Sequence, residues 1–90
     1  MPDTTLRDAG ARYEVDEQGL TSDADYRLDG PRMYLDYVFS PPALRGSGAS
    51  GRLMSALSQD ARDRGLKIKP ICGYAAAWLR RSPEFRDLVG

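Results

Sequence analysis

The chain has 90 residues, of which 41% are hydrophobic and 29% are charged, and its formal net charge is zero. This length and composition are those of one small globular domain, which we expect to cover residues 1–90, and they exclude disordered and fibrous classes. No apolar run approaches the roughly 20 residues that span a bilayer, and the single cysteine excludes an intramolecular disulfide.

The first part of the chain predicts antiparallel strands. Residues 1–10 are polar and are expected to be frayed, and they lack the basic and apolar regions of a signal peptide, so we expect a cytoplasmic location. Alternating apolar residues then predict strands over 11–15 and 24–28, separated by a turn at 16–19.

The third predicted strand, over 32–39, is the most apolar, and the pair Asp29-Gly30 predicts the turn that leads into it. Strict alternation along this strand would put four large apolar residues on one face: Met33, Leu35, Tyr37 and Phe39. Two prolines, Pro41 and Pro42, end its ladder because they lack N–H donors.

A glycine-rich loop follows this strand. Gly46, Gly48 and Gly51 remove side chains from the loop, so that consecutive backbone N–H groups can point at one ligand, and the helix that follows adds the positive end of its dipole. This arrangement suits a phosphate group, to which the flanking Arg45 and Arg52 could add bidentate contacts. The loop is neither a Walker A sequence nor a dinucleotide-binding G-x-G-x-x-G sequence.

The second half of the chain predicts a helix, a strand and a second helix. Apolar residues at helical spacing predict the first helix from residue 49 or 50 to residue 64, ended by Gly65. A short strand over 66–72 would complete a parallel crossover. The second helix is predicted over 74–81, followed by a closing turn over 82–89. Its expected inner face consists of Tyr74, Ala75, Trp78 and Leu79.

Charge is distributed unevenly along the chain. Residues 1–44 hold nine acids and four arginines, whereas residues 45–90 hold four acids and nine bases. Because the glycine-rich loop lies in the basic half, an anionic ligand is favoured. Nucleic acid would be an alternative partner for the same charge, but the basic residues are dispersed and no aromatic residues are interleaved with them, which disfavours it.

Three segments resemble a minimal GNAT-like N-acetyltransferase family: P-P-A-L-R-G-S-G at 41–48, G-L-K-I-K-P-I-C-G-Y at 65–74 and A-A-W-L-R-R-S-P-E-F-R-D-L-V at 76–89. The first contains the start of the family's pyrophosphate-binding motif R-x-x-G-x-G/A, with Arg45 and Gly48 in place and Ser50 as a departure. The resemblance implies an α+β fold of the acyl-CoA N-acyltransferase type, in which antiparallel strands precede a β-loop-α-β-α unit around a mixed sheet. It also implies an N-acetyltransferase that uses acetyl-CoA and an unidentified amine acceptor.

The resemblance further implies where the cofactor would lie. The pyrophosphate of CoA would rest on the loop amides, and the residues so assigned are Arg45, Gly46, Ser47, Gly48, Ala49, Ser50 and Gly51. The pantetheine arm would pass between the third and fourth predicted strands, and Arg80 and Arg81 could contact phosphate or adenine unless they are solvated helix ends. We assign no metal ligands.

Two residues are candidates for catalysis, Cys72 and Tyr74. By resemblance, the acetyl group reaches Cys72, which could accept the acetyl group, line its pocket, or be only a small buried side chain. By resemblance, Tyr74 is the acid that protonates the departing thiolate, and its alternative is a core aromatic residue with a polar tip.

The chain departs from the family before the loop. Family members commonly carry H-T-E-V-P-P, and this chain has Tyr37 and Phe39 where the family has His and Glu, with no histidine anywhere. A general base must therefore be a carboxylate, a tyrosine, Cys72 or water. Two functions stay open: an acetyl-CoA-dependent N-acetyltransferase, or a CoA-binding module with little or no transferase activity.

Overall fold

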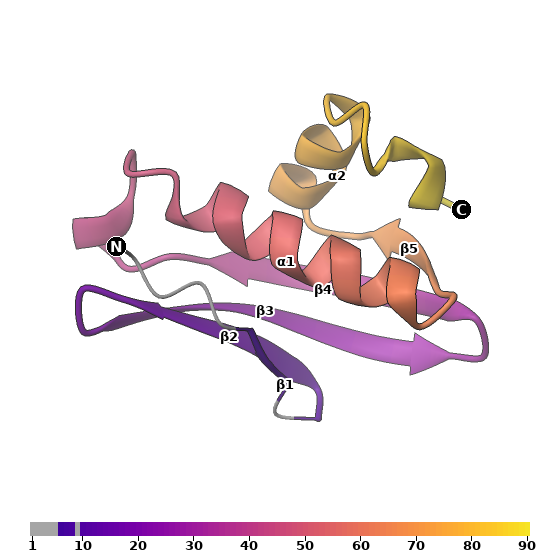
Figure 1. The fold of residues 1–90 in the computed structure, drawn as a ribbon, viewed down its shortest axis with the longest axis horizontal. Coiled ribbons are helices and arrows are strands. Elements are labelled where there is room, and N and C mark those ends of the chain that lie inside the picture. Colours follow the sequence, from indigo (N-terminus) through magenta and orange to yellow (C-terminus); the bar gives the residue numbers. More distant parts are fainter. Residues whose placement is uncertain (1–5, 9) are drawn as a thin grey trace.

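The computed structural model of the chain describes residues 6–8 and 10–90. Figure 1 shows a sheet with both α-helices lying against one of its faces. The strands lie in chain order and are β1 (Arg7–Asp8), β2 (Arg12–Glu17), β3 (Leu20–Asp29), β4 (Arg32–Phe39) and β5 (Lys67–Pro70). The helices are α1 (Ala49–Asp63) and α2 (Gly73–Arg80), and two short 3₁₀ turns cover Pro42–Leu44 and Arg86–Leu88.

The expected order of elements is confirmed. Strands β1 to β4 pair with one another antiparallel, whereas β5 pairs parallel to β4, so that α1 forms the predicted crossover. The expectation of a frayed segment over 1–10 is wrong at Arg7–Asp8, which forms a strand that pairs with β2. Pairing depends on backbone hydrogen bonds to β2, and the polar side chains of this segment do not indicate them. The rest of that expectation, at residues 1–5 and 9, lies outside the described residues.

The core fills the space between the sheet and the helices. Tyr13 on β2 and Tyr26 on β3 stack with ring centroids 4.6 Å apart, and both are buried. Helix α1 contributes a stripe at helical spacing that is fully buried, comprising Leu53, Leu57 and Ala61. Helix α2 contributes Ala75 and Leu79 to the same core, as the sequence predicts.

Gly65 ends α1, as predicted. Its φ of 71° lies in the left-handed region that favours glycine. The turn lets the amide of Leu66 donate to the carbonyl of Ala61 at 2.8 Å and directs the chain back to the sheet. Among the described residues, no helix combines the length and apolarity that crossing a membrane requires.

A bulge in β4 changes which residues face the core. Asp25 pairs with Tyr37, but the next residue on β3, Tyr26, pairs with Leu35, so that Asp36 is an extra residue on β4. The Asp36 carboxylate accepts two hydrogen bonds from the Arg27 guanidinium, at 2.7 and 3.0 Å. One extra residue reverses the alternation of side chains beyond it.

The predicted apolar face of β4 is therefore wrong in its second half. Met33 and Leu35 face the core, but Tyr37 is 53% exposed and its ring stacks with that of Phe39 at 6.5 Å. Val38 packs against the core in their place. By register, Tyr37 and Phe39 thus point to the face opposite to that of Val38. In the described part of the chain, both helices lie on the other face of the sheet (Figure 1).

Candidate functional site

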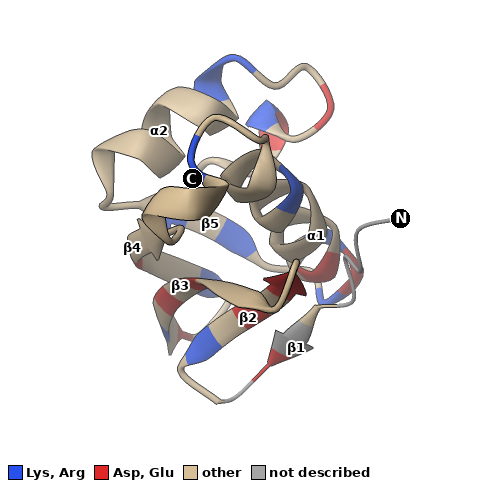
Figure 2. Cartoon of the chain, turned by 90° about the vertical axis from the view of Figure 1, so that its left-hand side faces the viewer, with Lys and Arg blue, Asp and Glu red and all other residues tan. Residues whose placement is uncertain are grey.

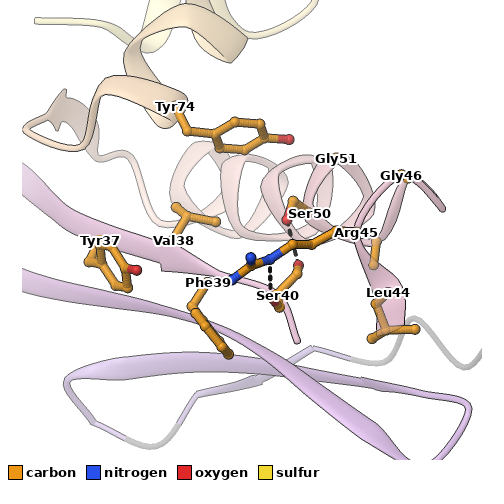
Figure 3. A pocket seen from close by; sticks show the side chains of 12 residues that line it. Tyr37, Val38, Phe39, Ser40, Leu44, Arg45, Gly46, Ser50, Gly51 and Tyr74 are labelled. Carbon is orange, nitrogen blue, oxygen red and sulfur yellow. Dashed lines mark hydrogen bonds between the residues drawn. The ribbon is translucent and has the colours of Figure 1, made fainter. Parts of the chain in front are cut away.

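The sheet opens where β4 and β5 part. Their last paired residues are Leu35 and Pro70, after which the amides of Ile71 and Cys72 both donate to the Leu35 carbonyl, at 2.9 and 3.1 Å. Strand β4 runs on to Phe39, and no strand among the described residues pairs with it on that side, while the chain beyond β5 turns into α2. A pocket of about 500 Å³ occupies this region, with the glycine-rich loop at one end and Tyr74 across from it (Figure 3).

The pocket is lined by parts of β4, the loop, α1 and α2. Its lining residues are Tyr37, Val38, Phe39, Ser40, Leu44, Arg45, Gly46, Gly48, Ala49, Ser50, Gly51 and Tyr74. Six of the seven loop residues that the sequence assigns to cofactor binding are among them. The exception is Ser47, whose hydroxyl donates to the Leu44 carbonyl at 2.5 Å and so holds the loop itself.

The loop reaches its shape through two glycines. Gly46 and Gly48 have φ values of 84° and 88°, and a side chain at Gly48 would lie 2.9 Å from a guanidinium nitrogen of Arg52. Gly48 caps α1, and the first amide that bonds within the helix is that of Arg52, which donates to the Gly48 carbonyl. The amides of residues 49–51 therefore have no acceptor within α1, which is the arrangement that binds anions at a helix start.

Arg45 is the charged residue of the pocket lining. Its Nε donates to the Ser40 carbonyl at 3.1 Å, and its guanidinium lies over the Phe39 ring, 5.6 Å from the centroid. Figure 3 shows this side chain crossing the pocket below the start of α1. The bond through Nε fixes the guanidinium plane while the residue stays exposed, so the pocket carries positive charge at the loop.

Arg52, the other flanking arginine, is not directed to a phosphate. It donates two hydrogen bonds of 2.6 Å to the carboxylate of Glu17 on β2, which is 3% exposed. The hydrogen bonds from Arg52 lower the pKa of Glu17 against the opposing effect of burial. Glu17 lies in the acidic half of the chain and Arg52 in the basic half, so the division of charge along the sequence does not reveal that these two residues neutralise each other. Figure 2 shows acidic and basic residues close together on the strands as well.

Three serine hydroxyls connect β3 to the start of α1. Ser22 Oγ lies 3.0 Å from Ser40 Oγ, which lies 2.5 Å from Ser50 Oγ. Ser22 and Ser40 are buried, and Ser50 lines the pocket. Sequence reasoning assigns Ser50 to cofactor binding, as a departure from the Gly/Ala of the motif, but it misses Ser22 and Ser40, because 18 residues separate these two in the chain.

Tyr74 belongs to the pocket rather than to the core. The expectation that it lies on the inner face of α2 is wrong, since it is 41% exposed and lines the pocket, whereas Ala75 and Leu79 are fully buried. It is the second residue of α2. Partial burial raises the pKa of Tyr74, so its hydroxyl stays protonated at neutral pH.

Other predicted site residues lie apart from this pocket. Cys72 caps α2 at the end of β5, as expected from the sequence, and its side chain packs against the core. Arg80 lines a separate hollow with Pro70, and Arg81 lines another with Trp78. The structure thus brings together the loop and Tyr74 and leaves Cys72, Arg80 and Arg81 outside the pocket lining.

Sequence and structure comparisons agree on one similarity. Residues 12–88 match the profile of a protein family described as GCN5-related N-acetyl-transferase. The fold is similar to the solution structure of a GCN5-like candidate N-acetyltransferase from Staphylococcus aureus, with a TM-score of 0.77 and 22% sequence identity over 100% of this chain and 91% of that one. None of the curated protein sequences shows significant similarity to this chain.

Proposed function

Because the chain belongs to the GCN5-related N-acetyltransferase family, we propose that it binds acetyl-CoA and transfers the acetyl group to an amine. The observation that carries this proposal is the pocket at the start of α1, where backbone amides, two left-handed glycines and Arg45 meet at the open edge between β4 and β5. These groups suit the negative charge of a diphosphate.

The loop and the open sheet suggest how the cofactor would lie. The diphosphate would rest on the amides that follow Gly48, with Arg45 alongside. The pantetheine arm would then run along the part of β4 that β5 leaves unpaired. Backbone N–H groups along that stretch are the candidates for stabilising the oxyanion that forms when an amine attacks the thioester carbonyl.

Transfer would proceed directly within a complex of cofactor and amine. The amine nitrogen forms a bond to the acetyl carbon, the bond from that carbon to sulfur breaks, and the CoA thiolate takes a proton. Tyr74 supports this step because it lines the pocket and keeps its proton at neutral pH. Binding of both reactants in one pocket supplies the entropic part of the rate enhancement.

The chain lacks the family's groups for removing the proton of the amine. The residues at the positions of the family's His and Glu, Tyr37 and Phe39, lie on the uncovered face of the sheet at the edge of the pocket. Since these positions hold neither the imidazole nor the carboxylate of the family, the amine must largely arrive deprotonated. The transfer rate should therefore rise steadily above pH 7.

Thermal unfolding with and without acetyl-CoA and CoA tests the proposal. A ligand at a hundred times its Kd stabilises the folded state by about 2.7 kcal/mol, which raises the melting temperature of a domain of this size by roughly 10–20 °C. Both ligands should give this shift, and added DNA should not reduce it. No shift at millimolar ligand would contradict the proposal.

A second measurement separates the enzyme from a binding module. Purified protein, acetyl-CoA and a panel of primary amines should release free CoA thiol at a rate that depends on the amine and on pH. A full thermal shift with no thiol release for any amine would support a CoA-binding module instead.

A further inference from the structure

The three serine hydroxyls run in line from the core to the pocket. Ser22 on β3 is 1% exposed, Ser40 at the end of β4 is 5% exposed, and Ser50 in the first turn of α1 lines the pocket. The oxygen separations of 3.0 and 2.5 Å are hydrogen-bond distances. Figure 3 shows the bond between Ser40 and Ser50 beside the Arg45 side chain.

A hydroxyl group has one hydrogen to donate, and this fixes the direction of the chain once a ligand is present. If Ser50 donates to an anionic oxygen in the pocket, it can only accept from Ser40. Ser40 then donates its hydrogen bond to Ser50 and can only accept one from Ser22. All three O–H groups would point toward the pocket, and each bond would polarise the next.

Ser40 is also the anchor of the pocket's arginine. Its carbonyl oxygen accepts from Arg45 Nε at 3.1 Å, while its hydroxyl bonds to Ser50. One buried residue therefore sets the positions of both a charged group and a hydroxyl at the start of α1. Ser58 provides a contrast, since it is also fully buried on α1 but its hydroxyl has no hydrogen-bond partner in the described part of the chain.

We propose that Ser50 is a direct ligand of the CoA diphosphate and that Ser40 and Ser22 are positioning residues that orient its hydroxyl. This inference rests on the proposed function. It gives a role to the serine at the last position of the motif, where the family has glycine or alanine: two further hydroxyls, one on β3 and one directly after β4, accompany it.

Calorimetric titration with CoA tests the chain in five proteins: wild type, Ser50→Ala, Ser40→Ala, the double variant, and Ser58→Ala as the control. Loss of a hydrogen bond to a charged oxygen should raise Kd about tenfold for Ser50→Ala. Ser40→Ala should raise Kd several-fold. The double variant should bind about as weakly as Ser50→Ala alone, because Ser40 acts through Ser50. Ser58→Ala should leave Kd unchanged.

The outcomes distinguish this inference from the proposed function. Wild-type protein that does not bind CoA would overturn both. Tight wild-type binding that survives Ser50→Ala or Ser40→Ala, or losses that multiply in the double variant, would overturn the hydroxyl chain alone. Melting curves without ligand report folding, and if Ser40→Ala does not fold, Ser22→Ala gives the same test with an expected rise in Kd of about twofold.

Discussion

The two helices begin at neighbouring points of the sheet but are held in different ways. Helix α1 starts at Gly48, and side chains from β2 and β3 reach its first turn through the pair of Glu17 with Arg52 and through the serine hydroxyls. Helix α2 starts at Cys72, where backbone amides bond to the Leu35 carbonyl. Within residues 6–8 and 10–90, neither helix has a side-chain hydrogen bond at its N-cap.

The difference shows what an anion site needs beyond a helix dipole. Both helices present unpaired amides and the positive end of a dipole. Glycine and small residues line the pocket at the start of α1, whereas Tyr74 is the part of α2 that lines it. We infer that α1 binds the cofactor and that α2 supplies a group for the chemistry.

The largest expected effect is from Gly48→Glu. The side chain would enter the space of Arg52, the φ of 88° strains any residue with a Cβ, and the carboxylate would repel phosphate. The thermal shift with CoA should disappear. Gly73→Glu is the matched control at the start of α2, where a Cβ meets open space, and it should keep the shift. An equal loss of the CoA-induced thermal shift in both variants would contradict the inference that CoA binds at the start of α1 and not at the start of α2.

Tyr74→Phe should separate chemistry from binding. Removing the hydroxyl of a general acid lowers turnover by about a hundredfold, while the ring that lines the pocket is kept. The CoA-induced thermal shift should stay as in wild type, and release of CoA thiol should slow. Unchanged turnover would assign protonation of the thiolate to water.

Glu17→Gln should loosen the support of α1. The substitution removes a buried carboxylate that accepts two hydrogen bonds from Arg52, and we expect the melting temperature to fall by roughly 5–10 °C. Affinity for CoA should fall only slightly, since Arg52 does not line the pocket that holds Arg45 and Tyr74. A melting temperature equal to that of wild type would show that the pair adds no stability.

Glu17→Gln should also change how the melting temperature depends on pH. Because the pKa of folded Glu17 lies below its ordinary value of 4.5, its contribution to stability is fully present above that pH and is lost as the pH falls through the folded pKa. Melting temperatures measured from pH 7 to pH 3 should therefore fall less steeply below pH 4.5 for Glu17→Gln than for wild type.

The smallest effect is expected from Cys72→Ala. Its side chain packs against the core at the start of α2, outside the pocket lining. Direct transfer predicts that the variant keeps CoA binding and turnover. Acetyl-CoA alone should add no acetyl mass to the wild-type peptide that contains Cys72. An acetylated Cys72 would contradict direct transfer. It would indicate a covalent acetyl-enzyme intermediate on the residue that caps α2.

Local sequence was enough to predict the order of elements and the loop. Apolar periodicity located α1, because its buried stripe repeats at helical spacing, and glycines marked the ends of strands and helices, because left-handed backbone favours them. The motif around Arg45 and Gly48 indicated the loop at the start of α1, since its residues are contiguous in the chain.

Tertiary structure decided which side chains meet in the site. The bulge at Asp36 follows from pairing with β3, and it turns Tyr37 and Phe39 away from the core against the alternation that the sequence suggests. The partners of Arg52 and Ser40 lie 35 and 18 residues away. Such contacts depend on strand register and on how α1 lies on the sheet, and these are set by the packing of the whole chain rather than by any segment of it.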